Sequence, residues 1–252
     1  MPAYCFTVDD NVRFLKEITE TTPKSIFDHP YAAMLRRLHE RFGIKIQLNL
    51  FYEMPGFTLA DMTAAYRHEW QENADWLKLS FHSKEETDRP YISSPYEEVY
   101  RDCEAVHREI CRFAGTATLA ATTTVHCCYT TREGAKALAD LGMRGLLGLF
   151  GTCASYSLPD EITAILRQGK TFSHEGITYA KLDLVVNCFK HEDLLKELAP
   201  LLTQDEVHVM IHEQYFYPDY RAYQPDFEEK LATVFTRLAA EGFENRFLEE
   251  MI

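Results

Sequence analysis

Short strand-like segments alternate with helical patterns along almost the whole chain. Seven segments have the two-residue alternation or the β-branched and leucine-rich content of strands, and they cover residues 4–10, 44–51, 76–82, 118–126, 145–150, 179–188 and 207–212. A further short strand is expected near Phe247. Helical patterns or loops separate these segments, and strands that alternate with helices are typical of a parallel sheet.

Polar stripes along several strands indicate a closed barrel. In segment 44–51, Ile46 and Leu48 alternate with Gln47 and Asn49, and segment 76–82 repeats this pattern. An open, doubly wound sheet usually has apolar residues on both faces of its strands, whereas a barrel strand has a face toward the lumen. No linker, repeat or low-complexity stretch divides the chain. The sequence therefore predicts an α/β fold, a single TIM-like (β/α) barrel domain over residues 1–252, with an irregular seven-stranded form.

Composition restricts the class of partner and the compartment. A formal charge of −13 argues against nucleic acid and anionic membrane surfaces as partners. No apolar run approaches the roughly 20 residues of a membrane span, and the N-terminus lacks the pattern of a secretory signal. The seven cysteines are scattered and mostly lie in apolar patterns, as reduced thiols do. We expect a cytoplasmic protein, with the oligomeric state left open, a homo-oligomer included.

The first predicted strand ends in two adjacent carboxylates, Asp9 and Asp10. Neighbouring carboxylates repel each other unless a cation or a shared proton separates them. A site that needs both a general base and an anionic metal ligand is one reason to place them together. The alternative is a turn or a helix cap, for which an Asp-Asp-Asn run is also common.

Three histidines end other predicted strands, namely His82, His126 and His212. In a parallel barrel the C-terminal ends of all strands lie at one rim, and functional sites form there. The two-residue period places each histidine on the more polar face of its strand, which we interpret as the lumen. This inference depends on the strand register, because a slip of one residue would turn a histidine outward.

Asp10 and His82 together predict a site for a divalent metal ion with mixed nitrogen and oxygen ligands. Two residues compete to be the third ligand. Glu86 follows His82 by four residues, so a helical turn would bring it back over the same point, although it can equally be a solvated loop carboxylate. His126 ends the neighbouring strand. Zinc suits such a ligand set best, and cobalt, nickel, iron and manganese are compatible with it.

Aromatic residues are also expected at the C-terminal rim of the barrel. The Tyr-rich segment that follows His212 begins with Glu213 and contains Tyr215, and Tyr129 follows His126 closely. We predict that Tyr129, Glu213 and Tyr215 contact a substrate, since aromatic rings stack on sugar faces. The alternative is an aromatic loop that only packs over the mouth of the barrel.

These residues resemble a known family. Asp9-Asp10, within Phe-Thr-Val-Asp-Asp, is similar to the Thr-Phe-Asp-Asp motif of the polysaccharide deacetylase superfamily, the carbohydrate esterase type. His82, in Ser-Phe-His-Ser, matches the first histidine of the family's His-x-x-x-His motif, and His212, in Val-Met-Ile-His-Glu, resembles its late-strand Leu-His. The resemblance implies a distorted (β/α)7 barrel that hydrolyses N- or O-acetyl groups with a bound divalent metal. By the same resemblance, Asp9 would be the general base, Asp10 a metal ligand and His212 the general acid.

The chain departs from the family pattern in two places, as a divergent member would. Glu86 stands where the family has its second histidine. His126-Cys127-Cys128-Tyr129 stands where the family has an Arg-Pro-Pro-like motif, whose arginine bonds to the base. By this resemblance the metal ligands would be Asp-His-Glu or Asp-His-His, and the residue that orients the base would be missing or replaced.

The expected function is metal-dependent hydrolysis of an acetylated or amide-bearing carbohydrate or small metabolite. One alternative is another metal-dependent barrel enzyme that acts on carbohydrate, by isomerisation or glycoside cleavage. The other is a catalytically degenerate barrel that binds a sugar. The missing Arg-Pro-Pro-like motif favours the hypothesis of a sugar-binding barrel without catalysis, and the intact Asp9-Asp10 pair argues against that hypothesis.

Overall fold

The computed structural model describes residues 1–252 except 88–89, 151–155 and 170. The strands are β1 (Ala3–Asn11), β2 (Ile46–Phe51), β3 (Glu53–Met54), β4 (Phe57–Thr58), β5 (Leu77–Ser83), β6 (Thr122–Thr123), β7 (Gly145–Gly148), β8 (Phe172–His174), β9 (Ile177–Lys181), β10 (Leu184–Val185), β11 (Glu206–His212) and β12 (Glu244–Asn245). The α-helices are α1 (Arg13–Thr21), α2 (Pro30–Phe42), α3 (Arg67–Glu72), α4 (Tyr96–Phe113), α5 (Arg132–Asp140), α6 (Asp160–Arg167), α7 (Leu194–Leu198) and α8 (Phe227–Ala240).

The strands close into a distorted (β/α)7 barrel, as predicted. One parallel run has the order β10-β11-β1-β2-β5, and a second has β6-β7-β9 with β8 antiparallel at its edge. A parallel bridge between Leu79 and Leu119 joins β5 to the segment that leads into β6. On the other side, the chain passes from β9 through Leu182 and Asp183 into β10. The amide of Leu182 donates to the carbonyl of Gly148 in β7, and that of Asp183 donates to the carbonyl of His208 in β11.

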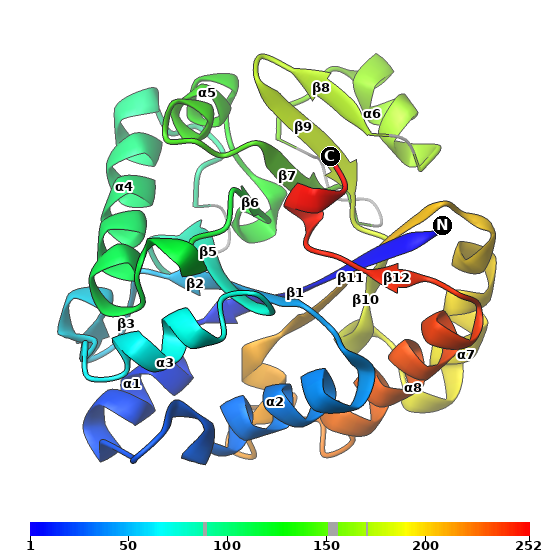
Figure 1. Ribbon diagram of the computed structural model, residues 1–252. Coiled ribbons are helices and arrows are strands. Elements are labelled where there is room, and N and C mark those ends of the chain that lie inside the picture. Colours follow the sequence, from blue (N-terminus) through cyan, green and yellow to red (C-terminus); the bar gives the residue numbers. More distant parts are fainter. Residues whose placement is uncertain (88–89, 151–155, 170) are drawn as a thin grey trace.

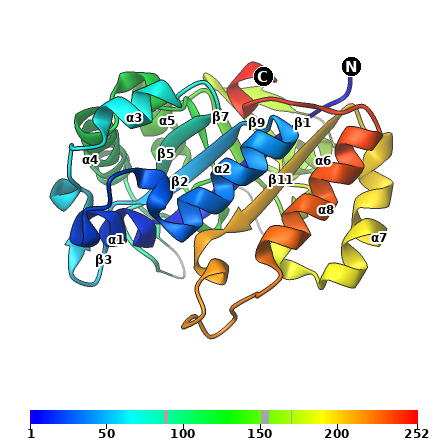
Figure 2. The same cartoon turned by 60° about the horizontal axis from the view of Figure 1, so that its bottom comes forward.

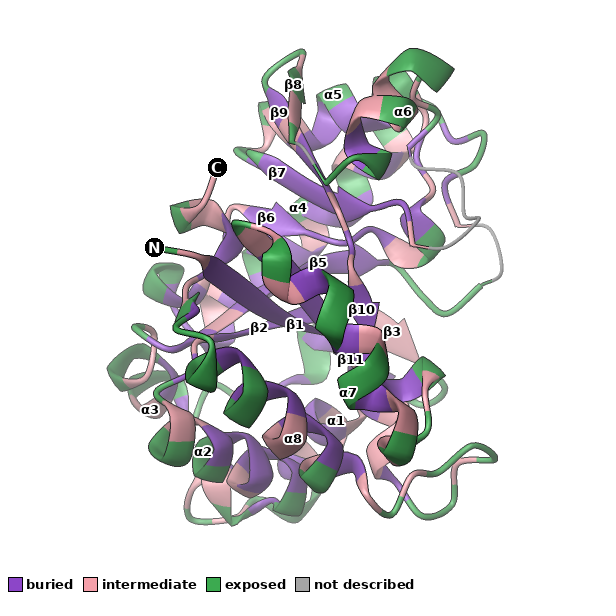
Figure 3. Ribbon diagram, turned by 90° about the vertical axis from the view of Figure 1, so that its right-hand side faces the viewer, coloured by how far each residue is buried: buried purple, intermediate pink, exposed green. Residues whose placement is uncertain are grey.

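The helices surround the strands on the outside of the barrel (Figure 1). The long helix α4 turns an apolar stripe inward, and this stripe includes Val99, Cys103 and Val106 at helical spacing. Burial follows the same layout, with buried strands and helices exposed on their outer faces (Figure 3). The main hydrophobic cluster extends from Tyr4 in β1 to Phe243 beyond α8. This continuity supports our proposal that residues 1–252 form a single domain.

Two predicted strands differ from the structure. The strand expected over 118–126 is reduced to β6, since 3-10 turns occupy both of its ends. The strand expected over 179–188 bends and divides between β9 and β10, because it pairs with β7 first and then with β11.

The segment 151–175 contains α6 and β8. Its residues 151–155 and 170 lie outside the described residues. Across the described part of the chain, no helix combines the length and the apolar content that crossing a bilayer requires.

The predicted site residues share one end of the barrel. Because β1 and β11 are parallel neighbours, their register pairs Asp9 directly with His212 at their C-terminal ends. The segment that joins β11 to α8 projects from the same end of the molecule (Figure 2). The rim predicted from the sequence is therefore present, and the chain between β11 and α8 contributes to it.

Candidate metal and catalytic site

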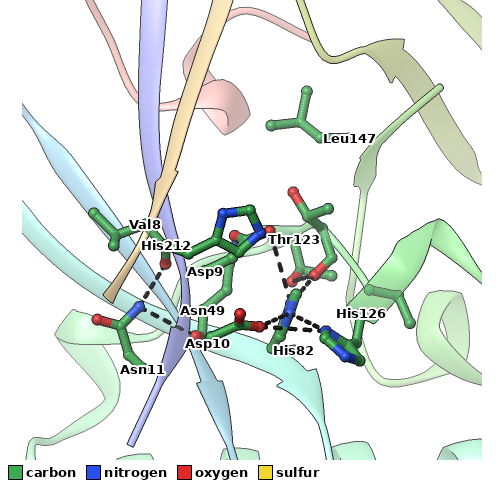
Figure 4. Close-up of polar contacts among 12 residues, drawn as sticks. Val8, Asp9, Asp10, Asn11, Asn49, His82, Thr123, His126, Leu147 and His212 are labelled. Atoms are coloured by element: carbon green, nitrogen blue, oxygen red, sulfur yellow. Dashed lines mark hydrogen bonds and ion pairs between the residues drawn. The ribbon is translucent and has the colours of Figure 1, made fainter. Parts of the chain in front are cut away.

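An irregularity in β1 brings both adjacent carboxylates to the same site. In a regular strand, the side chains of Asp9 and Asp10 would point to opposite faces. Asp10 instead has a left-handed backbone with φ of 62°, and the pairing of β1 with β2 shifts register between Val8 and Asn11. The buried Asn11 amide spans the kink by donating to the Val8 carbonyl at 2.5 Å. As a result, both carboxylates lie beside His82 (Figure 4).

Asp10, His82 and His126 form a compact cluster of possible metal ligands. Asp10 Oδ1 lies 3.0 Å from His82 Nε2 and 3.3 Å from His126 Nδ1, and these two ring nitrogens are 3.0 Å apart. One ligand atom from each residue lies within 4.8 Å of the other two. The three side chains point toward one another in Figure 4. Of the two candidates for the third ligand, the structure therefore brings His126 to Asp10 and His82.

The surrounding hydrogen bonds fit a bound cation. His82 Nδ1 donates to the carbonyl of Thr124 at 2.5 Å, and because a carbonyl can only accept, the neutral form of the ring turns the lone pair of Nε2 toward the cluster. Gln214 Nε2 donates to Asp10 Oδ2 at 2.5 Å, which occupies the second carboxylate oxygen. Outer partners of this kind orient metal ligands in proteins. Two imidazole nitrogens and one carboxylate oxygen thus make a donor set that suits a divalent metal ion.

Asp10 and His126 each stabilise the charged form of the other. Burial alone would raise the pKa of Asp10, but hydrogen bonds from His126 and His82 hold that pKa well below its usual range. Burial also disfavours the charged form of His126, yet its hydrogen bonds to Asp10 and Cys127 outweigh this and raise the pKa of His126 to about 10. The cluster therefore favours positive charge next to the Asp10 carboxylate.

Asp9 is almost completely buried and is held by a neighbouring strand. Asn49 of β2 donates from Nδ2 to Asp9 Oδ1 at 2.6 Å, and His82 Nδ1 lies 4.0 Å from Asp9 Oδ2. Burial raises the pKa of Asp9 against the opposing influence of His82, His212 and the Asn49 hydrogen bond. Asn49 makes the contact to this carboxylate that the family resemblance assigns to an arginine. The sequence signalled Asn49 only through its polar position in segment 44–51.

His212 lies beside Asp9 and is oriented by a residue that the sequence analysis missed. Its Nδ1 donates to Asn187 Oδ1 at 2.9 Å, and its backbone N–H donates to the same oxygen at 3.2 Å. Asn187 belongs to the 3-10 turn Val186–Cys188 that follows β10. The bond at Nδ1 leaves Nε2 of His212 available for other contacts. Nothing in the local sequence around Asn187 indicates this role, since the contact spans 25 residues.

A cavity of about 420 Å³ opens over Asp10, His126 and His212. Its lining among the described residues consists of Asp10, Glu86, Thr87, His126, Cys127, His212, Gln214 and Tyr215. The Tyr215 ring is centred 6.0 Å from that of His212. The predicted substrate contact of Tyr215 is therefore compatible with its place on the wall, and it stays a prediction.

Two other predicted site residues lie differently. Glu86 is exposed on the cavity wall and stays outside the ligand cluster, because residues 84–87 do not form the helical turn that would bring it back over His82. Tyr129 is partly buried and is not among the described residues that line the cavity. We therefore do not propose a substrate contact for Tyr129.

Glu213 has a structural position instead of the substrate contact that the sequence suggested. Its buried carboxylate accepts hydrogen bonds from the backbone N–H groups of Val12, Arg13 and Phe14, at 2.8, 3.1 and 2.8 Å. The Tyr217 hydroxyl donates to it at 2.8 Å. The first N–H groups of a helix have no partner within the helix, so Glu213 caps α1 from the far end of the chain.

Replacing Glu213 with alanine is expected to lower the free energy of unfolding by about 3 kcal/mol, because buried donors at the start of α1 lose their acceptor. Urea denaturation of both proteins measures this difference. Glu213→Gln is the matched variant, since it keeps one acceptor oxygen, and it should lose less stability. Equal stability of wild type and Glu213→Ala would contradict the capping role.

Comparisons with known proteins establish the fold. No protein-family model and no curated protein matches the sequence. Among solved structures, a family 4 acetyl xylan esterase from Clostridium thermocellum in complex with a cobalt ion matches with a TM-score of 0.56 and 11% identity, over 99% of this chain and 89% of that one. A family 4 carbohydrate esterase from Streptomyces lividans in complex with acetate matches with a TM-score of 0.56 and 9% identity, over 98% and 93%.

A 4-alpha-glucanotransferase from Thermococcus litoralis also matches, with a TM-score of 0.59 and 13% identity, over 99% of this chain and 40% of that one.

The chain shares the fold of the family 4 carbohydrate esterases. The resemblance inferred from the Asp9-Asp10, His82 and His212 motifs is thereby confirmed at the level of the fold.

Proposed function

We propose that this protein is a metal-dependent hydrolase that removes acetyl groups from a carbohydrate or from a small ester or amide metabolite. The observation that carries this proposal is the cluster of Asp10, His82 and His126, with Asp9 and His212 paired beside it on neighbouring strands. The acetyl xylan esterase bound to cobalt and the carbohydrate esterase bound to acetate share this fold and support the choice of reaction.

Asp10, His82 and His126 would hold the metal ion, with zinc as the preferred ion and cobalt, nickel, iron or manganese as compatible ones. A divalent ion there would supply Lewis acidity toward a carbonyl oxygen and a more acidic bound water. The buried position of Asp10 and His82 keeps competing water away from two of the three ligands.

Asp9 and His212 are the groups that accept and donate protons in the proposed reaction. Because Asn49 occupies Oδ1 of Asp9, Oδ2 is the oxygen that takes the proton from the attacking water. A carboxylate whose pKa burial has raised is a better proton acceptor than an exposed one. On the other side of Asp9, His212 delivers a proton from Nε2 to the leaving group while Asn187 holds Nδ1. Tyr215 forms the wall against which the acyl group or sugar lies.

The test is an acetate-release assay with purified protein reconstituted with zinc or cobalt. Acetylated xylan oligosaccharides, N-acetylated chitin oligosaccharides and an aryl acetate represent the ester and amide classes. We expect acetate release from at least one of them, lost on chelation and restored by added metal. No release from any of these substrates after reconstitution with either metal would contradict the proposal.

A second candidate function is a metal-dependent reaction on carbohydrate that releases no acetate. The similarity to the 4-alpha-glucanotransferase supports keeping it, since that enzyme shares the fold and acts on glucans. Product analysis separates the two candidates, because transfer or cleavage would change the length of an oligosaccharide without producing acetate.

A further inference from the structure

A chain of hydrogen bonds runs from Asp9 into the lumen of the barrel. Asn49 Nδ2 donates to Asp9 Oδ1 at 2.6 Å, and Gln47 Nε2 donates to Asn49 Oδ1 at 2.7 Å. Gln47 Nε2 also donates to the backbone carbonyl of Thr122 in β6 at 2.8 Å. None of these four residues has more than 1% of its surface exposed, so solvent does not offer replacement partners.

The carbonyl of Thr122 gives this chain a fixed direction. A backbone carbonyl can only accept, so Gln47 must present its NH₂ group there and not its oxygen. The second N–H of that group donates to Asn49, which must therefore present its own carbonyl oxygen to Gln47. The amide nitrogen of Asn49 is then left facing Asp9. The Thr122 hydroxyl donates to Gln47 Oε1 at 2.8 Å, which agrees with the same orientation.

We propose that Gln47 is a positioning residue that acts on Asp9 through Asn49. It sets the orientation of the Asn49 amide, so that Asn49 donates to Oδ1 of Asp9 and leaves Oδ2 as the proton-accepting oxygen. The inference rests on the proposed role of Asp9 as the base. If the Asn49 amide flipped, two acceptor oxygens would face each other and the Asp9 carboxylate would lose its anchor. The neutral side-chain amides of Gln47 and Asn49 thus orient the Asp9 carboxylate, a function that the family resemblance assigns to a single arginine.

The test compares Gln47→Met, which keeps the length of the side chain but has no donor, with Ser80→Ala. Ser80 is a matched control because its buried hydroxyl donates to the same Thr122 carbonyl at 2.7 Å but makes no hydrogen bond to the Gln47 or Asn49 side-chain amide. Both variants should lower the melting temperature by a similar amount, about 3 °C. Only Gln47→Met should lower kcat for acetate release, by about 10- to 100-fold, with KM and metal content unchanged.

A second readout follows the Asn49 side-chain amide by ¹H–¹⁵N NMR and does not depend on activity. Its protons should resist exchange in D₂O in wild type and Ser80→Ala, and lose that protection in Gln47→Met. Gln47→Leu, which likewise has no donor for Asn49, should behave like Gln47→Met and replaces Gln47→Met if that variant does not fold. Unchanged protection in either Gln47 variant would overturn the inference. If wild type releases no acetate, the proposed function fails. The exchange experiment still tests whether Gln47 orients the Asn49 amide, because it does not depend on activity.

Discussion

Replacing His82 with alanine is expected to prevent the purified protein from binding the proposed metal ion. His82 Nε2 lies 3.0 Å from both Asp10 Oδ1 and His126 Nδ1, so it is the shared neighbour of the other two ligand atoms. Its removal leaves only two ligands. We therefore expect a loss of metal affinity larger than the roughly 10- to 100-fold effect of removing an outer partner. Elemental analysis of tag-free protein should find about one divalent ion per chain in wild type and essentially none in the variant.

Glu86→Gln is the control for this experiment and also tests the rejected alternative for the third ligand. Because Glu86 is exposed and outside the cluster, its amide variant should keep the metal, whereas His126→Ala should lose most of it. Metal lost in Glu86→Gln and kept in His126→Ala would reverse this assignment. Wild type that takes up no zinc, cobalt or manganese would contradict the metal site and favour a sugar-binding barrel.

Changing Asp9 to asparagine is expected to abolish most activity while the metal stays bound. Asp9 is not one of the three clustered ligands, so the metal content should remain that of wild type. The amide cannot take the proton of the attacking water, and loss of a general base lowers kcat by about 10²- to 10⁴-fold. Parallel measurement of acetate release and metal content on the same preparation gives both quantities.

Asp10→Asn provides the contrast, because the neighbouring carboxylate has the other proposed role. It should lose metal and activity together, since its Oδ1 is the oxygen in the cluster. Full activity in Asp9→Asn would remove Asp9 from the mechanism. Loss of metal in Asp9→Asn as great as in Asp10→Asn would mean that the two carboxylates act as one ligand group.

Features that depend on local periodicity could be predicted from the sequence. Alternating polar and apolar residues in segments 44–51 and 76–82 indicated lumen-facing strands, and β2 and β5 are the neighbouring barrel strands that resulted. The same two-residue period placed His82 and His212 toward the lumen near the ends of β5 and β11, where both lie beside Asp9. Once strands are parallel, their C-terminal ends share a rim, so the convergence of these histidines with Asp9 followed from the pattern.

Features that depend on contacts between distant residues were decided only by the tertiary structure. The left-handed backbone at Asp10 overrides strand alternation and turns two consecutive carboxylates to one site, held by Asn11. Asn187 and Asn49 reach His212 and Asp9 across 25 and 40 residues.

Glu213 was misjudged for the same reason, because its partners at the start of α1 are about 200 residues away in the chain. Sequence periodicity determines which face of an element is polar. The partner that each polar group finds there depends on how the elements pack, because a buried donor or acceptor must be satisfied by whatever the fold brings within reach.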